Sequence, residues 1–380
     1  MKNRHQKELN YKKSSLLFIK LLLFFLVVNA LSIYFPIIRY GNYLLPVLAI
    51  IFSIITKKQD KVIDSYFNSY IILYFVLVSL SFLLIAFRND IYLRFFEEAF
   101  FIFAPLLTVK YMFYDYKIEN TNLYYKILIW GLISLFFLER GSDILGVLSP
   151  KIFEAAVLDS TISTESSSSF LFGLLSVHFW INKKRRYFIV TLILTIISFK
   201  RIAIGAVFIS ILLYQLMELF NSVRIKKWIP FIAVLANLLI VYFLYNLFYG
   251  YYNYIINDIT GISTNAFFMG RQTILNYVIA SSELTVYSGA GLGKINDLLL
   301  SSSIGLLLHS DIIKIFIEFG LILFIVWIYI LYKINRDTLK ETSLLIYMNV
   351  LFITDNTLIY FNVMFLFYLL QGINHTIKKN

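Results

Sequence analysis

The sequence predicts an all-α, polytopic integral membrane protein with about 12 transmembrane helices. Of its 380 residues, 59% are hydrophobic and only 15% are charged, and the mean hydropathy is +0.77. A water-soluble domain of this size could not carry so much apolar surface. The apolar residues also fall in long runs, and about 20 helical residues are needed to cross roughly 30 Å of hydrocarbon. We therefore expect a single membrane domain over residues 1–380.

The transmembrane helices are predicted from these apolar runs in chain order. The first run follows the basic start MKNRHQKELNYKK and is too long for a cleaved signal peptide, so we expect it to remain as the first span. Several runs are short, which leaves counts of ten or eleven spans open. The expected spans cover residues 15–35, 40–56, 66–87, 95–114, 122–138, 169–182, 187–199, 202–221, 229–249, 312–332, 342–356 and 358–373.

The distribution of basic residues predicts the orientation of these spans. The chain has 34 Lys and Arg residues and a net charge of +12. Such a charge can indicate a nucleic-acid partner, but here most basic residues lie in alternate loops, which is the pattern of a topology signal. We therefore expect no nucleic-acid partner, a multi-pass protein of the cell membrane, and both termini in the cytoplasm.

Two outward loops are long under this topology, residues 139–168 and residues 250–311. A long connection in a compact protein is usually functional or disordered. The second loop lies between the ninth and tenth spans and contains two apolar pieces, RQTILNYVIA and IGLLLH. We expect short helices there, on or in the outer membrane surface. We place the functional site in this large loop.

Three outward basic residues depart from the topology pattern. Lys200 and Arg201 lie in ISFKRIAIG between two spans, and Arg271 follows Gly270 at the start of a helix-like piece. Each could be a snorkelling residue or a surface residue of an amphipathic helix. If they converge, they form a site for a dianionic group such as pyrophosphate, because Arg stays charged and makes bidentate contacts.

A charged stretch, HSDIIKIFIEFG, opens the tenth span. If Ser310 caps a helix that begins at Asp311, then Asp311, Lys314 and Glu318 lie on one helical face. That face either pairs internally at i,i+3 and i,i+4 or forms the polar wall of an outward-facing cavity. His309, the one histidine expected on the outer side, could take a proton from a hydroxyl group.

Other patterns allow fewer conclusions. The glycines of GAGLGK, which include Gly291 and Gly293, allow a close approach of the backbone to a ligand or another helix, or simply a tight turn. Glu97 and Glu98 are placed to pair with Arg94 at the membrane boundary. The tyrosines of YNLFYGYYNY predict an aromatic belt, with stacking on sugar rings as the alternative.

Several classes of chemistry are excluded or disfavoured. The chain has no cysteine, which excludes disulfides, thiolate nucleophiles and Cys-ligated metals. It also lacks an HExxH motif, a GxSxG motif and a Cys/His cluster. We therefore expect no metal and no cofactor.

Four segments between residues 195 and 332 occur in a characteristic order: ISFKRIAIGAVFISILL, STNAFFMGRQTIL, GAGLG and LHSDIIKIFIEFGLILFIVWIYIL. In this order they resemble the superfamily of Wzy-type O-antigen and capsule polymerases and O-antigen ligases. The last segment is similar to the family signature of a His, a polar residue, an apolar helix and Glu-x-Gly, here His309, Ser310, Glu318 and Gly320. Ser310 stands where Asn is common in the family.

The resemblance implies a metal-independent, lipid-linked glycosyltransferase at the outer face of the bacterial cytoplasmic membrane. Its donor would be a glycan on undecaprenyl pyrophosphate, its acceptor another lipid-linked repeat unit, and its product a capsule or O-antigen polysaccharide. A flippase and a chain-length regulator are further partners that it implies. By position, Arg201 and Arg271, with Lys200, would hold the pyrophosphate, and His309 would orient or deprotonate the acceptor hydroxyl. The predicted substrate-binding residues are Lys200, Gly291, Gly293, Asp311, Lys314 and Glu318.

Three other functions stay open at this point, one of them a non-catalytic scaffold. A polysaccharide-precursor flippase or other transporter would also need about 12 spans, but transporters commonly carry polar sites in both halves of the chain. Here we expect the buried charge to concentrate after residue 195, and one outer loop is very long. An O-antigen-ligase-type transferase, which moves a finished glycan to a different acceptor, is the closer alternative.

Overall fold

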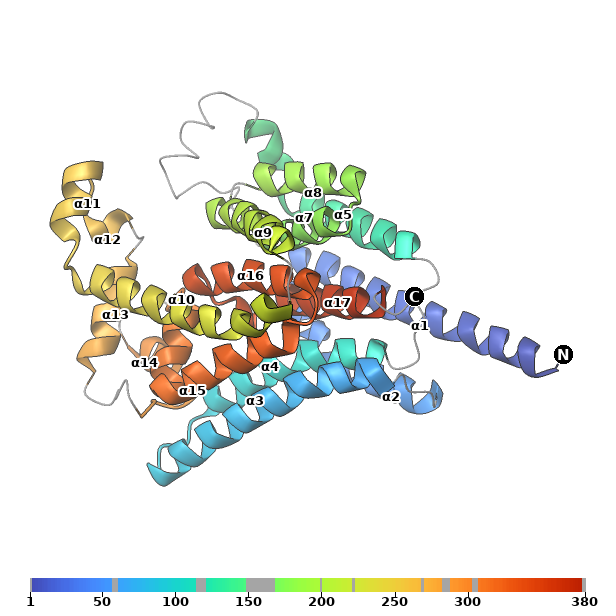
Figure 1. Ribbon diagram of the computed structural model, residues 1–380, viewed down its shortest axis with the longest axis horizontal. Helices are drawn as coiled ribbons and strands as arrows, with labels where there is room; N and C mark the ends of the chain where they lie inside the picture. The colour runs from blue at the N-terminus through green and yellow to red at the C-terminus, as the bar shows by residue number, and fades with distance from the viewer. Residues whose placement is uncertain are drawn as a thin grey trace. The chain divides into compact units, whose positions relative to one another are not determined.

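The computed structural model describes residues 2–56, 61–113, 121–147, 168–198, 200–220, 223–267, 270–281, 288–302 and 307–377. Over these residues the chain is helical and contains no strand, which confirms the all-α fold class (Figure 1). The chain divides into two compact units. The first comprises Met1–Ser69, Phe103–Tyr214 and Phe361–Asn380, and the second comprises Tyr70–Ile102 and Gln215–Tyr360.

Six helical segments in the described parts of the chain are long and apolar enough to cross a membrane. They are Pro36–Ile54, Asp64–Phe87, Asn122–Gly141, Arg201–Leu219, Lys226–Tyr249 and Asp311–Asn335. Two shorter apolar helices, Phe18–Tyr34 and Ser168–Ile181, add to them. The protein is therefore a helical membrane protein. The count of twelve spans, their orientation and the single membrane domain stay predictions.

The first unit contains the N-terminal helices, the middle of the chain and the C-terminal helix. Its elements are α1 (Lys2–Tyr34), η1 (Pro36–Leu44), α2 (Leu45–Thr56), the start of α3 (Lys61–Phe87), the end of α4 (Leu93–Met112), α5 (Thr121–Val147), α7 (Ser168–Ile181), α8 (Arg185–Ile197), most of α9 (Arg201–Leu219) and α17 (Phe361–Ile377). Helix α5 continues to Val147, into the first predicted outer loop, and residues 148–167 of that loop lie outside the described residues.

Neutral side chains hold the first unit together between its apolar helices. Asn29 of α1 and Asn42 of η1 exchange amide hydrogen bonds of 3.3 Å, and Asn362 of α17 donates to Asn29 at 2.7 Å. A second group joins α5, α7 and α17, and it consists of Tyr125, His178, Asn182 and Asn374. Buried amides need such partners because lipid offers them none.

The second unit contains the large predicted loop and the helices around it. Its elements are the end of α3, the start of α4, the end of α9, α10 (Val223–Tyr249), α11 (Asn253–Thr260), α12 (Thr264–Phe267), α13 (Arg271–Ala280), α14 (Lys294–Ser301), α15 (Asp311–Asn335), α16 (Leu339–Thr354) and η2 (Thr357–Ile359). Helix α10 packs against α13 and α15, and α14 packs between α13 and α15. The shared core consists of Leu247, Phe248, Ile274, Leu275, Val278, Ile295, Leu299, Leu308, Ile313 and Ile317.

The predicted helices of the large loop are confirmed in part. Helix α13 covers RQTILNYVIA from its first residue to its last. The prediction is wrong for the end of IGLLLH, because Leu307, Leu308 and His309 are not helical, while Ile304–Leu306 lie outside the described residues. Ser310 has extended backbone angles and accepts a hydrogen bond from Ile313 N at 3.4 Å. The predicted cap at Ser310 is thus confirmed, and it starts α15 at Asp311.

Helix α15 is interrupted at Gly320, whose φ of 75° and ψ of 170° are not helical. The interruption leaves carbonyl groups at the end of the first half without helical partners. The GAGLGK segment supplies those partners, since Ala290 N donates to Ile317 O at 3.0 Å and Gly291 N donates to Glu318 O at 2.8 Å. A Cβ on Gly289 would lie 2.7 Å from Glu318 O, so this position requires glycine.

Candidate functional site

His309 lies beside a carboxylate that the sequence analysis did not identify. Its Nδ1 atom is 3.6 Å from Oδ1 of Asp355, with the histidine side chain 44% exposed and the aspartate side chain 7% exposed. Tyr360 OH donates a hydrogen bond of 3.0 Å to the same Oδ1 atom. An accessible imidazole beside a buried, oriented carboxylate is an arrangement that can move a proton.

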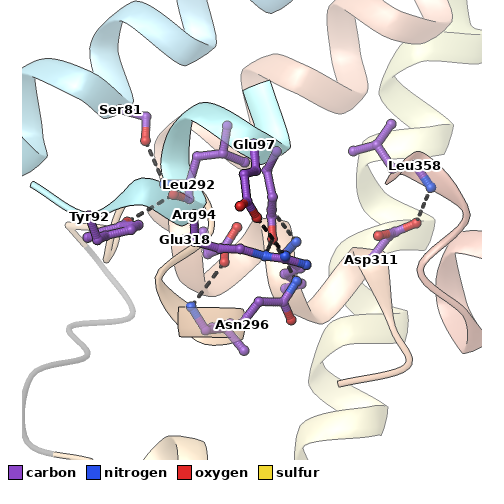
Figure 2. Close-up of polar contacts among 12 residues, drawn as sticks. Ser81, Tyr92, Arg94, Glu97, Leu292, Asn296, Asp311, Glu318 and Leu358 are labelled. Carbon is purple, nitrogen blue, oxygen red and sulfur yellow. Dashed lines mark hydrogen bonds and ion pairs between the residues drawn. The ribbon is translucent and has the colours of Figure 1, made fainter. Parts of the chain in front are cut away.

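Asp311 connects the start of α15 to the segment that carries Asp355. Its buried carboxylate accepts a 2.7 Å hydrogen bond from Leu358 N (Figure 2), and its own N–H donates to Asp355 O at 3.2 Å. These two bonds run in opposite directions between the same two segments. They fix the position of Asp355 relative to His309, which immediately precedes the Ser310 cap.

Lys314 and Glu98 form a buried ion pair between α15 and α4. Glu98 also accepts a 2.6 Å hydrogen bond from Asn296 Nδ2, and Arg94 Nε lies 3.5 Å from its Oε1. Arg94 contacts Glu97 as well, at 2.8 Å (Figure 2). The predicted pairs of Arg94 with both glutamates are confirmed. Glu98 additionally neutralises a lysine on another helix.

Glu318 binds the start of α14. Its Oε1 accepts a 3.1 Å hydrogen bond from Ile295 N, near the helix N-terminus where a negative charge is favourable (Figure 2). Asp311, Lys314 and Glu318 therefore each have a partner on a different element. Lys314 also interacts electrostatically with Asp311 and Glu318 on its own helix, so internal pairing, one of the two expected arrangements, is present as well. All three side chains are buried in protein contacts. Their assignment to substrate binding stays a prediction.

The glycines of GAGLGK are required by close packing as well as by the backbone. A Cβ on Gly291 would lie 2.4 Å from Ile85 Cγ1, and one on Gly293 would lie 3.0 Å from Arg94 O. Both residues have positive φ, 99° and 81° respectively. Close approach to helices α3, α4 and α15, one of the expected alternatives, is what the structure contains. Substrate binding by Gly291 and Gly293 stays a prediction.

The GAGLGK segment is also bonded to the α3–α4 connection. Leu292 N donates to Ser81 Oγ at 2.7 Å, and Tyr92 OH donates to Leu292 O at 2.9 Å (Figure 2). Lys294 Nζ pairs with Asp90 Oδ2 at 2.5 Å. Burial raises the pKa of the Tyr92 phenol well above its usual value, so it remains a donor at physiological pH. The GAGLGK segment is thus bonded at three points to residues in and around the α3–α4 connection.

The predicted basic residues divide between the two units. Lys200 and Arg201 belong to the first unit, and Lys200 Nζ lies 4.4 Å from the centre of the Phe170 ring. Arg271 and His309 belong to the second unit, with Arg271 at the first position of α13 after Gly270, whose φ is 79°. Lys200 precedes α9 and Arg201 begins it, and Arg271 begins α13, as the sequence predicts. Convergence of the three cations with His309 stays a prediction.

No group of three or more His, Asp or Glu side chains that could hold a metal ion occurs among the residues with described structure. The sequence signal for Asp355 was its place in TDNT, at the end of the predicted span 342–356 that was expected to face outward. Comparison with known proteins gave no match, since no family model, curated protein or solved structure matches the chain. The family resemblance therefore rests on the four sequence segments alone.

Proposed function

We propose that the protein polymerises lipid-linked oligosaccharide repeat units into a capsule or O-antigen polysaccharide, at the outer face of a bacterial cytoplasmic membrane. The donor is a glycan on undecaprenyl pyrophosphate, and the acceptor is the non-reducing end of another lipid-linked repeat unit. The four family-like segments support this proposal. The structural observation that carries it is the accessible His309 imidazole beside the buried Asp355 carboxylate.

His309 is the proposed general base. A carboxylate next to Nδ1 favours the tautomer with its proton on Nδ1, which leaves Nε2 able to accept one. The acceptor hydroxyl oxygen bonds to the anomeric carbon while its proton moves to Nε2. The bond from that carbon to the pyrophosphate oxygen breaks, and its electron pair leaves with the lipid pyrophosphate. The 3.6 Å separation is long for a hydrogen bond, but such contacts commonly tighten when substrate binds.

Arg271 and Arg201, assisted by Lys200, are the proposed ligands of the pyrophosphate. A pyrophosphate is already a good leaving group, so stabilising its growing charge is the main requirement. Guanidinium groups do this with bidentate hydrogen bonds and a permanent charge. The reaction as written needs neither a metal nor a cofactor. A flippase would deliver the substrate, and a chain-length regulator would act on the product.

The decisive experiment is elongation of a purified lipid-linked repeat unit by the reconstituted protein. We expect the wild-type chain to produce a ladder of longer products and His309→Ala to produce none. His375→Ala is the matched control, because His375 belongs to the first unit and stacks on Tyr66. A full ladder from His309→Ala would contradict the assignment of His309 to the site. No elongation by the wild-type chain would contradict the proposed function.

Deletion of the gene separates the proposed function from its alternatives. Loss of a polymerase leaves single repeat units displayed outside the cell. Loss of a flippase traps repeat units inside, and loss of a ligase lets lipid-linked polymer accumulate. Complementation with the His309→Ala gene should reproduce the polymerase pattern.

A further inference from the structure

Helix α11 follows the end of α10 after a three-residue turn. Helix α10 contains the membrane-spanning segment Lys226–Tyr249, and the turn begins at Gly250, whose φ is 102°. Figure 1 shows α11 turning away from the α10 axis. Gly261, with φ of 68°, ends α11 after Thr260. The short helix is thus held beside one end of the membrane-spanning segment by two glycine turns.

One side of α11 is packed onto the second unit. Tyr252 and Ile256 contact the core formed by α10, α13, α14 and α15. Asn253 accepts a 3.1 Å hydrogen bond from Gln272 Nε2, which lies next to Arg271 at the start of α13. These contacts determine which side of α11 faces away from the protein.

The neighbouring side of α11 carries a stripe of exposed apolar residues. Tyr251, Ile255 and Ile259 are spaced four residues apart and are 69%, 52% and 78% exposed. Ile262 extends the stripe beyond the glycine turn and is 47% exposed. Four large apolar side chains with this exposure, two on α11 and two in the turns beside it, are costly to leave in water. They require an apolar environment in the working protein.

The bilayer is the occupant that the surrounding residues favour. Exposed apolar residues, including Leu239 and Phe243, occur along the membrane-spanning segment of α10, which ends at the turn before α11. The rings of Tyr249 and Tyr251 stack with centroids 5.5 Å apart where α10 meets the turn. Tyrosines concentrate at the level of lipid headgroups because one end of each ring is apolar and the other is polar. The stripe therefore continues a lipid-facing surface.

We infer that α11 is an interfacial helix whose stripe, Tyr251, Ile255, Ile259 and Ile262, lies in the lipid at the end of α10. Its helix contains no Lys or Arg and one exposed acidic residue, Asp258, so apolar burial holds it there rather than attraction to anionic lipids. The Asn253–Gln272 hydrogen bond connects this anchor to the start of α13. The inference does not depend on the proposed function.

The native chain contains no cysteine, so single-cysteine labelling needs no background mutations. We would label Ile259→Cys and Ile255→Cys with an environment-sensitive fluorophore in phosphatidylcholine vesicles, with and without brominated acyl chains. Asn257→Cys is the matched control, because Asn257 is exposed and lies about 160° around the helix from Ile259.

We expect brominated lipid to quench the labels at 255 and 259 several-fold more strongly than the label at 257. Aqueous iodide should give the reverse order. Equal quenching at the three positions would overturn the inference. Shielding of position 259 from iodide without quenching by brominated lipid would also overturn it, because a protein partner or a second copy would then cover the stripe.

Discussion

The buried polar side chains of the two units differ in charge. Every buried Asp, Glu or Lys side chain in the described parts of the chain belongs to the second unit: Glu98, Asp311, Lys314, Glu318, Glu341 and Asp355. The buried polar residues of the first unit are Asn, Gln, Ser, Thr and His. An ionised group inside an apolar protein costs far more than an amide or hydroxyl. Such groups are retained where they serve a function, which directs attention to the second unit.

A network of neutral side chains can lose one hydrogen bond and keep the others. An ion pair that loses one member leaves the other charge without a partner. The Asn29–Asn42–Asn362 group shares several hydrogen bonds among three amides, so removing one leaves the others paired. Removing one member of Lys314–Glu98 leaves a buried charge without its counter-ion. The comparison therefore predicts that a substitution in the Lys314–Glu98 ion pair lowers stability much more than one in the amide network.

The largest effect is expected for Lys314→Met. Removing one partner of a buried ion pair typically costs about 3–5 kcal/mol, because the other charge stays buried without compensation. We expect Lys314→Met to lower the free energy of unfolding in detergent by about that amount. Thermal unfolding measures it. The double variant Lys314→Met with Glu98→Gln should recover most of the loss, and failure to recover would show that packing rather than charge dominates.

Asp355→Asn should reduce activity with little change in stability. The substitution keeps the side-chain volume but removes the charge beside His309 Nδ1. General-base catalysis contributes about 10²–10⁴-fold, and we expect a loss of at least the lower value in the elongation rate. Product ladders over time give this rate.

Tyr360→Phe is the control for Asp355→Asn. It removes one hydrogen bond to Asp355 and leaves the carboxylate beside His309. We expect a much smaller loss of rate from it. Equal losses from both variants would indicate that the carboxylate acts only through its packing.

Gly291→Ala should destabilise the second unit by about 1–3 kcal/mol, because positive φ and overpacking each carry a cost of that order. Its Cβ would meet Ile85 and its φ is 99°. Gly205→Ala, in α9 of the first unit, is the matched control, since a Cβ there meets nothing within 4 Å. We expect the control to be neutral or slightly stabilising. Equal melting temperatures for the two variants would contradict the tight packing of the loop.

Asn29→Ala should have the smallest effect. Hydrogen bonds between polar side chains in membrane proteins average about 0.6 kcal/mol. The remaining Asn42 and Asn362 amides still share a hydrogen bond of 3.4 Å. We expect a loss of about 1 kcal/mol in unfolding experiments, well below that of Lys314→Met. A loss of stability as large as that of Lys314→Met would contradict the expected difference between the amide network of the first unit and the ion pair of the second.

Local features of the second unit were predictable from its sequence. Ser310 caps α15, α13 begins at Arg271, and the glycines of GAGLGK adopt the positive φ that a turn composition favours. Each depends on residues within a few positions of one another. The conformation of a short segment follows from side-chain size, capping groups and hydrophobic period, all of which the sequence displays.

Long-range partners were not predictable in the same way. Periodicity placed Lys314 and Glu318 on one helical face and suggested that they pair with each other. In the structure their partners are Glu98, 216 residues away, and Ile295 N, 23 residues away. Asp355 lies near His309 only because the segment between α16 and α17 returns to the start of α15. The periodicity of a single helix does not predict which residues of other elements will contact it.

By itself the sequence determined that this is a helical membrane protein, since so many apolar residues in long runs are compatible with lipid and not with water. It also determined the start of α15 and the composition of the loop. Tertiary structure alone decided which charges are buried together, where α15 is interrupted, and which carboxylate lies next to His309. The reason is physical: a buried charge is stabilised by whichever group the fold brings within a few ångströms, wherever that group lies in the chain.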